Sequence, residues 1–327
     1  MVQQPGETRP RWTDPDWRRD AEDWVRARVA ELGGSVAAIE QPHVRPWGTV
    51  FRVSTDAGTL WFKAAVAAMA FEPALLQLLG DRRPDAVPRL LAADRDRIWM
   101  LMEDAGVRLH HVYADDPPLE VWEDFVARYA QLQLELAPSA EQLIRDGVPD
   151  NRSTRAVDKF VATLEDDWLM RELPLTPPTE DELARVRALE PRLRAAVAAL
   201  DALGLPDSIQ HDDLHAWNVC VHDGDYRFID WGDSCVGHPL GSLGVPLWHL
   251  PDQSEAARAR VRDAYLEPWT HLAAREELRA AADAAVLVAH MTGVLKWTLL
   301  HSHLAERGGY EDVIPERLRE LLAETCA

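Results

Sequence analysis

A short polar segment, Gln210–Gly232, carries the residue types needed to transfer a phosphoryl group. It contains Asp213, then Asn218 five residues later, and Asp230 twelve residues beyond that. Loops held by rigid strands commonly display catalytic groups, so this carboxylate and amide can face one metal-bound phosphate. The segment therefore predicts one carboxylate for an attacking hydroxyl, and two oxygen ligands, Asn218 and Asp230, for Mg²⁺.

Short β segments are expected to hold this loop in place. Ser208–Gln210 leads into it and Val219–His222 leaves it, while Asp223-Gly224 turns the chain into Tyr226–Asp230. Asp230 then stands at a strand end, from which it can enter the same cleft. The alternative interpretation is that the polar residues only complete a turn, with Asp213 as a cap and the histidines in the core.

The motifs in this segment resemble those of kinases. His211-x-Asp213-Leu214-x-x-x-Asn218 matches the catalytic loop, and Asp230-Trp231-Gly232 stands where kinases place Asp-Phe-Gly. His215 and the sequence Ile229-Asp230-Trp231 resemble the aminoglycoside phosphotransferase and choline kinase family more closely than protein kinases. No Ala-Pro-Glu element follows Asp230, and His238-Pro239 comes eight residues later, which leaves no room for an activation loop. A small-molecule substrate is therefore favoured over a protein.

This resemblance implies an α+β, two-lobed, protein-kinase-like fold with a small β-rich N-terminal lobe and a larger, mainly helical C-terminal lobe. Residues 1–102 would form the nucleotide-binding lobe with a leading helix, and residues 103–327 the catalytic and acceptor-binding lobe. Asp213 would orient or deprotonate the acceptor hydroxyl, Asn218 and Asp230 would hold Mg²⁺, and His211 would be structural.

Lys63 is the expected nucleotide contact in the first lobe. It ends the second strand of a predicted hairpin, Val50–Ser54 and Thr59–Lys63, where kinases place the lysine that pairs with the α and β phosphates. Among 35 basic residues only Lys63, Lys159 and Lys296 are lysines, so a lysine at this position is informative. Glu72 is the expected ion-pair partner, and a solvated helical glutamate is the alternative.

The resemblance also implies further nucleotide contacts. Gly48 and Thr49 occupy the position of the phosphate-covering loop, where backbone amides and a small hydroxyl can cradle phosphates, although an ordinary β-turn explains these residues equally well. Backbone groups of Met102 and Asp104 would meet the adenine edge, with Leu101 guarding the pocket behind it.

The remaining pattern predicts a mostly helical chain around these elements. Gly33-Gly34 should end the first helix, and Pro191 should kink or divide the helical segment that a Thr179/Glu182 capping box begins. The expected elements are helices at Asp14–Leu32, Ala64–Leu79, Leu119–Leu136 and Glu182–Leu203, a buried strand at Arg97–Met102, and helices over the remainder of the chain after Asp230.

Composition excludes several classes of partner. The formal net charge of −20 disfavours nucleic acid and favours a cationic substrate, although acidity that only maintains solubility is an equal alternative. No apolar stretch is long enough for a membrane span or signal peptide, so a cytoplasmic protein is expected. The three cysteines, Cys220, Cys235 and Cys326, are too few and too widely spaced for a disulfide framework or a zinc site.

The sequence thus predicts Mg²⁺-dependent transfer of the γ-phosphate of ATP or GTP to a hydroxyl of a small, cationic acceptor such as an aminoglycoside. An amino sugar or a choline-like alcohol is an alternative acceptor. Two other functions stay open: a metal-dependent phosphohydrolase using His110-His111, His211-Asp212 and Asp230, and a non-catalytic nucleotide-binding protein. The sequence assigns no acceptor-binding residue and no oligomeric state. Candidates that equally suit core packing are Asp263, Tyr265, Glu267, Trp269, His290, Trp297 and His301.

Overall fold

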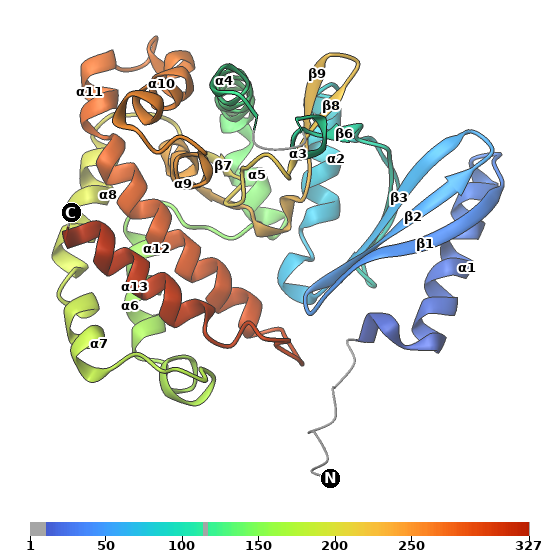
Figure 1. Cartoon of the computed structure of the whole chain (residues 1–327), viewed down its shortest axis with the longest axis horizontal. Helices are drawn as coiled ribbons and strands as arrows, with labels where there is room; N and C mark the ends of the chain where they lie inside the picture. The colour runs from blue at the N-terminus through green and yellow to red at the C-terminus, as the bar shows by residue number, and fades with distance from the viewer. Residues whose placement is uncertain (1–10, 114–116, 327) are drawn as a thin grey trace.

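The computed structural model describes residues 11–113 and 117–326 and divides into a sheet-rich N-terminal lobe and a helical C-terminal lobe (Figure 1). The N-terminal lobe is a five-stranded antiparallel sheet in the order β1-β2-β3-β5-β4. Its elements are α1 (Pro15–Glu31), β1 (Val36–Arg45), β2 (Gly48–Thr55), β3 (Gly58–Ala65), α2 (Glu72–Arg82), β4 (Leu90–Asp94) and β5 (Trp99–Glu103). The two-lobed α+β fold expected from the sequence is confirmed.

Helix α1 begins and ends where its sequence signals indicate. The carboxylate of Asp14 accepts hydrogen bonds from the backbone N–H groups of Asp16 and Trp17, and a proline follows the cap. After the helix, Gly33 adopts φ +83°, which only glycine adopts at little cost. The buried face of α1, including Trp24 and Val25, packs on the sheet.

The hairpin of β2 and β3 confirms the prediction, but the helix expected from Ala64 does not start there. Ala64 and Ala65 pair with Thr49 and Gly48 as the last residues of β3, and the regular helix α2 starts only at Glu72. Alanine has a high helix propensity, yet pairing with a neighbouring strand overrides a local preference of this size. Strand β1 was not predicted, because its exposure does not alternate with a period of two.

The C-terminal lobe is built on helices, of which α4 matches its predicted bounds. The predicted segment Glu182–Leu203 is two helices divided before Pro191, and Thr179 and Glu182 form the expected capping box. The helices are α3 (Leu109–Val112), α4 (Leu119–Leu136), α5 (Ala140–Arg145), α6 (Thr154–Leu164), α7 (Glu180–Arg187), α8 (Glu190–Asp201), α9 (Gly244–His249), α10 (Glu255–Leu266), α11 (Arg275–Ala280), α12 (Ala282–His301) and α13 (Val313–Cys326).

Two small antiparallel sheets lie where the lobes meet and frame the polar loop. The first joins β7 to β10, and the second runs in the order β6-β8-β9. The strands are β6 (Val107–Arg108), β7 (Ser208–Gln210), β8 (Val219–His222), β9 (Asp225–Phe228) and β10 (Cys235–Gly237). The strands β7, β8 and β9 confirm the sequence prediction, whereas β10 lies in a stretch for which helices were expected, so that expectation is wrong there.

The C-terminal end of α12 joins the two lobes a second time. Leu300 and Leu304 are buried in the hydrophobic cluster of the N-terminal lobe, together with Phe51 and Phe62. Helix α12 is the one described helix long and apolar enough to cross a membrane, and 72% of its apolar window is buried inside the protein, as in a core helix. In Figure 1, α12 and α13 lie side by side across the C-terminal lobe.

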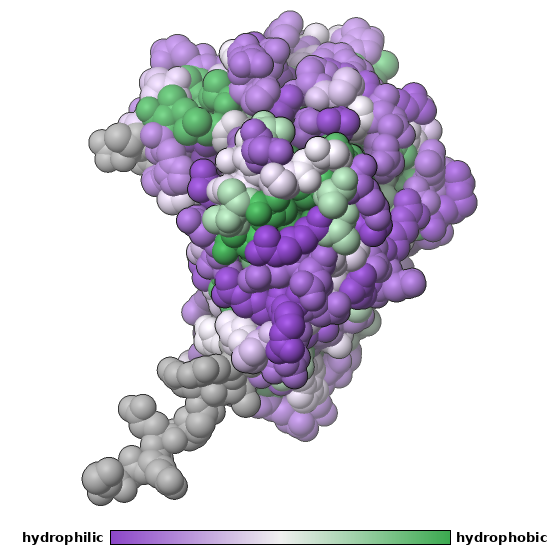
Figure 2. Space-filling view, turned by 90° about the vertical axis from the view of Figure 1, so that its right-hand side faces the viewer, coloured by the Kyte–Doolittle hydropathy of each residue, from purple (hydrophilic) through white to green (hydrophobic). Residues whose placement is uncertain are grey.

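The turn between β1 and β2 also reaches α12. Trp47 in this turn packs edge-to-face on Trp297, with ring centroids 5.5 Å apart, and on Tyr310 at 4.7 Å. These contacts join the turn to the C-terminal lobe. Seen from the side of the N-terminal lobe, the surface is mainly hydrophilic with small hydrophobic patches, in keeping with a charged-residue content of 28% (Figure 2).

Candidate active site

Hydrogen bonds between the polar loop and the end of β9 bring the three motif residues to one place. The Ile229 N–H donates to the Asn218 carbonyl at 3.0 Å, so the residue that follows, Asp230, emerges beside Asn218. His211 is fully buried, and burial lowers its pKa to about 4, so its neutral ring donates from Nε2 to the Ile229 carbonyl at 2.9 Å. His211 therefore ties the loop to β9, as a structural residue would.

Besides Asp223 in the β8–β9 turn, two residues next to the catalytic carboxylates have a backbone conformation that side chains disfavour. Asp212 has φ +55° and Asp230 has φ +65°, both in the left-handed region. Each such residue costs about 1 to 3 kcal/mol and persists only where the surroundings enforce it. The strain falls on the residue before Asp213 and on Asp230 itself, so the backbone is held in the conformation that aims these two carboxylates.

Asp213 is surrounded by donors. Asn218 Nδ2 donates to its Oδ2 at 2.7 Å and to its carbonyl at 2.9 Å, His215 Nε2 lies 3.3 Å from Oδ2, and Lys296 Nζ lies 3.8 Å from Oδ1. Burial by itself raises the pKa of Asp213, but the Lys296 ammonium and the contacts with His215 outweigh burial, so the pKa lies well below its usual range. Asp213 is thus a carboxylate that can only accept hydrogen bonds.

Lys63 forms the predicted ion pair and a second one that was not predicted. Its Nζ lies 2.6 Å from Glu72 Oε1 and 2.6 Å from Asp230 Oδ1. Burial favours the neutral amine, but the two carboxylates outweigh it and raise the pKa of Lys63. The short helical turn Ala67–Met69 precedes α2. This turn brings Glu72 next to Lys63 of β3, although only nine residues separate the two in sequence. Lys63 therefore links the N-terminal lobe directly to Asp230.

The donor set of Asn218 and Asp230 suits Mg²⁺. Asn218 directs Nδ2 to Asp213, which leaves its amide oxygen as an acceptor, and the Asp230 side chain is 55% exposed to the cleft. Mg²⁺ takes oxygen ligands and is commonly held by one or two protein groups together with phosphates and water. Within residues 11–113 and 117–326, no three His, Cys, Asp or Glu side chains gather as a metal-holding cluster.

Thr49 and Gly48 have structural roles that were not predicted from the sequence. The buried Thr49 hydroxyl donates to the His43 carbonyl at 2.7 Å and accepts from Gln41 Nε2 at 2.9 Å. Because the hydroxyl is buried and hydrogen-bonded within the fold, it does not face a nucleotide, which corrects the expectation that it contacts a phosphate. At Gly48, a Cβ would lie 2.7 Å from the Ala64 carbonyl oxygen, so strand pairing requires glycine. The phosphate-covering role stays a prediction for the backbone amides of Gly48 and Thr49.

Replacing Thr49 by valine tests this correction. The variant removes two hydrogen bonds, one from the hydroxyl to the His43 carbonyl and one from Gln41 Nε2 to the hydroxyl, so the free energy of unfolding should fall by about 1 to 3 kcal/mol. Nucleotide affinity, measured by calorimetry, should change by less than about threefold. The matched control is Thr59→Val on the neighbouring strand, where the hydroxyl has only a 3.5 Å contact with Arg52. Weaker nucleotide binding at unchanged stability would restore the phosphate role of the hydroxyl.

The connection between the lobes contains the two expected adenine contacts. Met102 lies in β5, and Asp104 directly follows it. The carboxylate of Asp104 accepts from Trp61 Nε1 at 2.9 Å and from the Gly106 N–H at 2.7 Å, and its carbonyl accepts from Arg227 at 3.0 Å. Asp104 thus stabilises the link between β5 and the sheet of β8 and β9, and contacts of its N–H and of Met102 with adenine stay predictions.

The residues invoked for a phosphohydrolase do not converge. His110 stacks on Trp217 with ring centroids 3.6 Å apart, and His111 packs on the same indole edge-to-face. His211 is committed to the Ile229 carbonyl, and the carboxylate of Asp212 accepts from Cys235 Sγ at 3.1 Å. The described histidines of this hypothesis therefore serve packing and loop structure.

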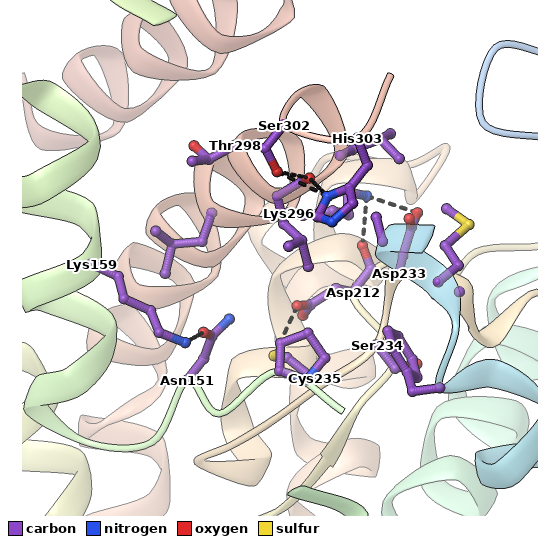
Figure 3. A pocket seen from close by; sticks show the side chains of 18 of the residues that line it. Asn151, Lys159, Asp212, Asp233, Ser234, Cys235, Lys296, Thr298, Ser302 and His303 are labelled. Carbon is purple, nitrogen blue, oxygen red and sulfur yellow. Dashed lines mark hydrogen bonds and ion pairs between the residues drawn. The ribbon is translucent and has the colours of Figure 1, made fainter. Parts of the chain in front are cut away.

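A cavity of about 800 Å³ opens beside the catalytic loop (Figure 3). Its walls come from the residues before α2, from α6, from the segment after Asp230, and from the end of α12. Two polar residues at its edge were missed at the sequence level, Asp233 and Lys296, whose Nζ lies 3.1 Å from Asp233 Oδ2. The rarity of lysine was the one signal that pointed to Lys296.

A smaller cavity, lined by Asp213, Trp248, His249 and Arg317 among others, shares Asp212 and Lys296 with the larger one.

A lysine of the N-terminal sheet paired with a glutamate of α2, beside an Asp-Asn loop and the aspartate that follows β9, is the arrangement of protein-kinase-like phosphotransferases. Comparison with known families agrees: residues 47–281 match the phosphotransferase enzyme family APH, and the chain belongs to this family. Its enzymes are small-molecule phosphotransferases.

Solved structures share the fold at low sequence identity. A choline kinase from Cryptosporidium parvum has a TM-score of 0.64 at 10% identity, covering 94% of this chain and 95% of its own. A putative fructosamine-3-kinase from Thermobifida fusca has a TM-score of 0.53 at 21% identity, covering 91% and 98%. The streptomycin–ATP ternary complex of APH(2″)-IIa has a TM-score of 0.52 at 12% identity, covering 93% and 95%. No curated protein sequence gave a significant match.

Proposed function

We propose that this protein transfers the γ-phosphate of ATP or GTP to a hydroxyl group of a small, cationic acceptor. The observation that carries the proposal is the Asp213 carboxylate, held ionised by Lys296 and His215 and hydrogen-bonded to Asn218, the proposed metal ligand. Residues 1–102 would supply the nucleotide contacts, and residues 103–327 the catalytic loop and the acceptor site. ATP is a cytoplasmic donor, so we place the enzyme in the cytoplasm.

In this mechanism Asp213 accepts the proton of the acceptor hydroxyl as the hydroxyl oxygen attacks the γ-phosphorus. The bond between the γ-phosphorus and the bridging oxygen breaks, and the nucleoside diphosphate leaves with the electron pair. Lys63, fixed by Glu72, pairs with the α and β phosphates. Asn218 and Asp230 would hold Mg²⁺, which neutralises charge on the phosphates when it is bound.

Two observations support a cationic acceptor. The formal net charge of −20 attracts cations to the protein and repels anions. The similar structures carry names that specify choline, fructosamine and streptomycin, and each of these molecules combines a cationic nitrogen with hydroxyl groups. We therefore place aminoglycosides first and keep amino sugars and choline-like alcohols as the alternatives.

A panel of acceptors tests the proposal. Aminoglycosides, fructosamines, other amino sugars and choline are each offered with ATP or GTP and Mg²⁺, and nucleoside diphosphate formation is followed in a coupled assay. Glucose and inositol serve as neutral polyhydroxyl controls. We expect at least one cationic compound to stimulate consumption, and Asp213→Asn to abolish the stimulation. Stimulation only by the neutral compounds would contradict the cationic class, and consumption independent of both acceptor and Asp213 would contradict the transferase.

A further inference from the structure

Lys296, on α12, connects the last helical hairpin of the protein to the catalytic loop. Its Nζ lies 3.2 Å from the carbonyl oxygen of Asp212, 3.1 Å from Asp233 Oδ2 and 3.8 Å from Asp213 Oδ1. Figure 3 shows the ammonium pointing from α12 toward the loop, with dashed contacts to Asp212 and Asp233. Only 14% of the side chain is exposed, so these contacts replace most of its hydration.

The surroundings keep this lysine charged. Burial favours the neutral amine, but Asp233, Asp213 and Asp212 outweigh burial and raise the pKa of Lys296. Three acidic residues thus share one cation. If the ammonium were removed, Asp233 would lose its ion pair and Asp213 would keep only His215 and Asn218 as partners, which is costly at a buried site.

The contact with the Asp212 carbonyl falls at the strained position of the loop. Asp212 has φ +55°, and a donor from α12, 84 residues away in sequence, holds its carbonyl oxygen. The next residue is Asp213. A change in the orientation of this peptide would therefore move the Asp213 carboxylate directly, while Lys63, Glu72 and Asp230 belong to other segments and would keep their places.

We propose that Lys296 is a positioning residue for phosphoryl transfer, which holds the strained peptide before Asp213 and the Asp213 carboxylate in the orientation that meets the acceptor hydroxyl. The inference rests on the proposed function. It adds a component from α12 to a site that otherwise comes from the sheet, the catalytic loop and the residues after β9.

The test begins with Lys296→Met, which keeps the length of the side chain and removes the charge. Displacement of a catalytic group by about 1 Å can lower the rate about 100-fold, so kcat should fall by about that factor. The KM for nucleotide and its calorimetric Kd should change by less than about threefold. The matched control is Arg152→Met, which removes another partly buried cation, one paired with Asp150 and Glu141 instead of the catalytic loop. This control should keep kcat.

A double-mutant cycle separates positioning from general stability. If Lys296 acts through Asp213, Lys296→Met should lower kcat little further once Asp213→Asn is present. Full additivity of the two losses, or a kcat within threefold of wild type in the single variant, would overturn the inference while leaving the proposed function intact. Failure of the wild-type protein to transfer phosphate to any acceptor would instead count against the proposed function.

A crystal structure of Lys296→Met gives a readout that does not depend on activity. We expect the Asp212 φ angle to leave the left-handed region and the Asp213 carboxylate to move by about 1 Å or more. A catalytic loop unchanged in the variant would overturn the positioning role whatever the acceptor is.

Discussion

Replacing Asp213 by asparagine is expected to lower kcat by about 100- to 10,000-fold while leaving nucleotide affinity almost unchanged. The amide has nearly the shape of the carboxylate but cannot take a proton from the acceptor. It also removes the charge that Lys296 and His215 stabilise. The variant should still bind nucleotide, because the predicted phosphate contacts come from Lys63 and from the proposed metal ligands Asn218 and Asp230.

The measurement combines steady-state kinetics with calorimetric titration of the nucleotide. Asp225→Asn is the control, because this carboxylate is 60% exposed and pairs with Arg128 outside the site. The control should keep both kcat and Kd. If Asp213→Asn retained more than a tenth of the wild-type kcat, the assigned role of Asp213 would be wrong.

Replacing Asp230 by asparagine should make the nucleotide affinity respond differently to Mg²⁺. In the presence of Mg²⁺ the Kd should rise by at least about 10- to 100-fold, because even indirect partners of a metal contribute that much to its affinity. In EDTA the variant should bind nucleotide as well as wild type or better. There the substitution removes a negative charge from beside the phosphates and releases Lys63 from the 2.6 Å contact with Asp230.

Calorimetric titration of the nucleotide with Mg²⁺ and with EDTA checks whether the effect of the substitution on Kd differs between the two conditions. A thermal unfolding curve verifies that the variant is folded. Two results would disagree with the assignment. One is an equal loss of affinity in EDTA and in Mg²⁺, which would make Asp230 a general support of the fold. The other is an unchanged affinity in both conditions.

The local parts of the site were predictable from the sequence because their signals are local. The spacing of Asp213, Asn218 and Asp230 lies within one loop and hairpin, and the structure brings the loop and the end of β9 together. The position of Lys63 at the end of a hairpin strand depended only on strand alternation and a turn. The ion pair with Glu72 followed from its position in the next helix.

What could not be predicted depends on contacts between distant segments. Nothing near Lys296 in the sequence indicates that α12 reaches the catalytic loop. Thr49 looked like a loop hydroxyl because β1, its hydrogen-bonding partner strand, lacks a regular alternation of exposure. Ala64 and Ala65 looked helical because alanine favours helices, until strand pairing overrode that preference.

The unassigned candidates near the C-terminus show the same limit. Tyr265 is buried and donates to the Pro239 carbonyl at 2.7 Å, and Trp269 is buried in the core. Trp297 packs between Trp47 and Tyr310. Their spacing along the helices suited packing and ligand binding equally, and the structure gives these three residues packing roles.

The fate of the γ-phosphate distinguishes transfer to an acceptor from transfer to water. The enzyme is supplied with ATP or GTP, Mg²⁺ and each acceptor of the panel in ¹⁸O-enriched water, and the products are followed by ³¹P NMR. We expect a phosphomonoester of a cationic acceptor, free of oxygen from water, that forms with the wild-type protein and not with Asp213→Asn. Inorganic phosphate carrying ¹⁸O as the sole product with every acceptor would show transfer to water and would rule out the proposed transfer to an acceptor.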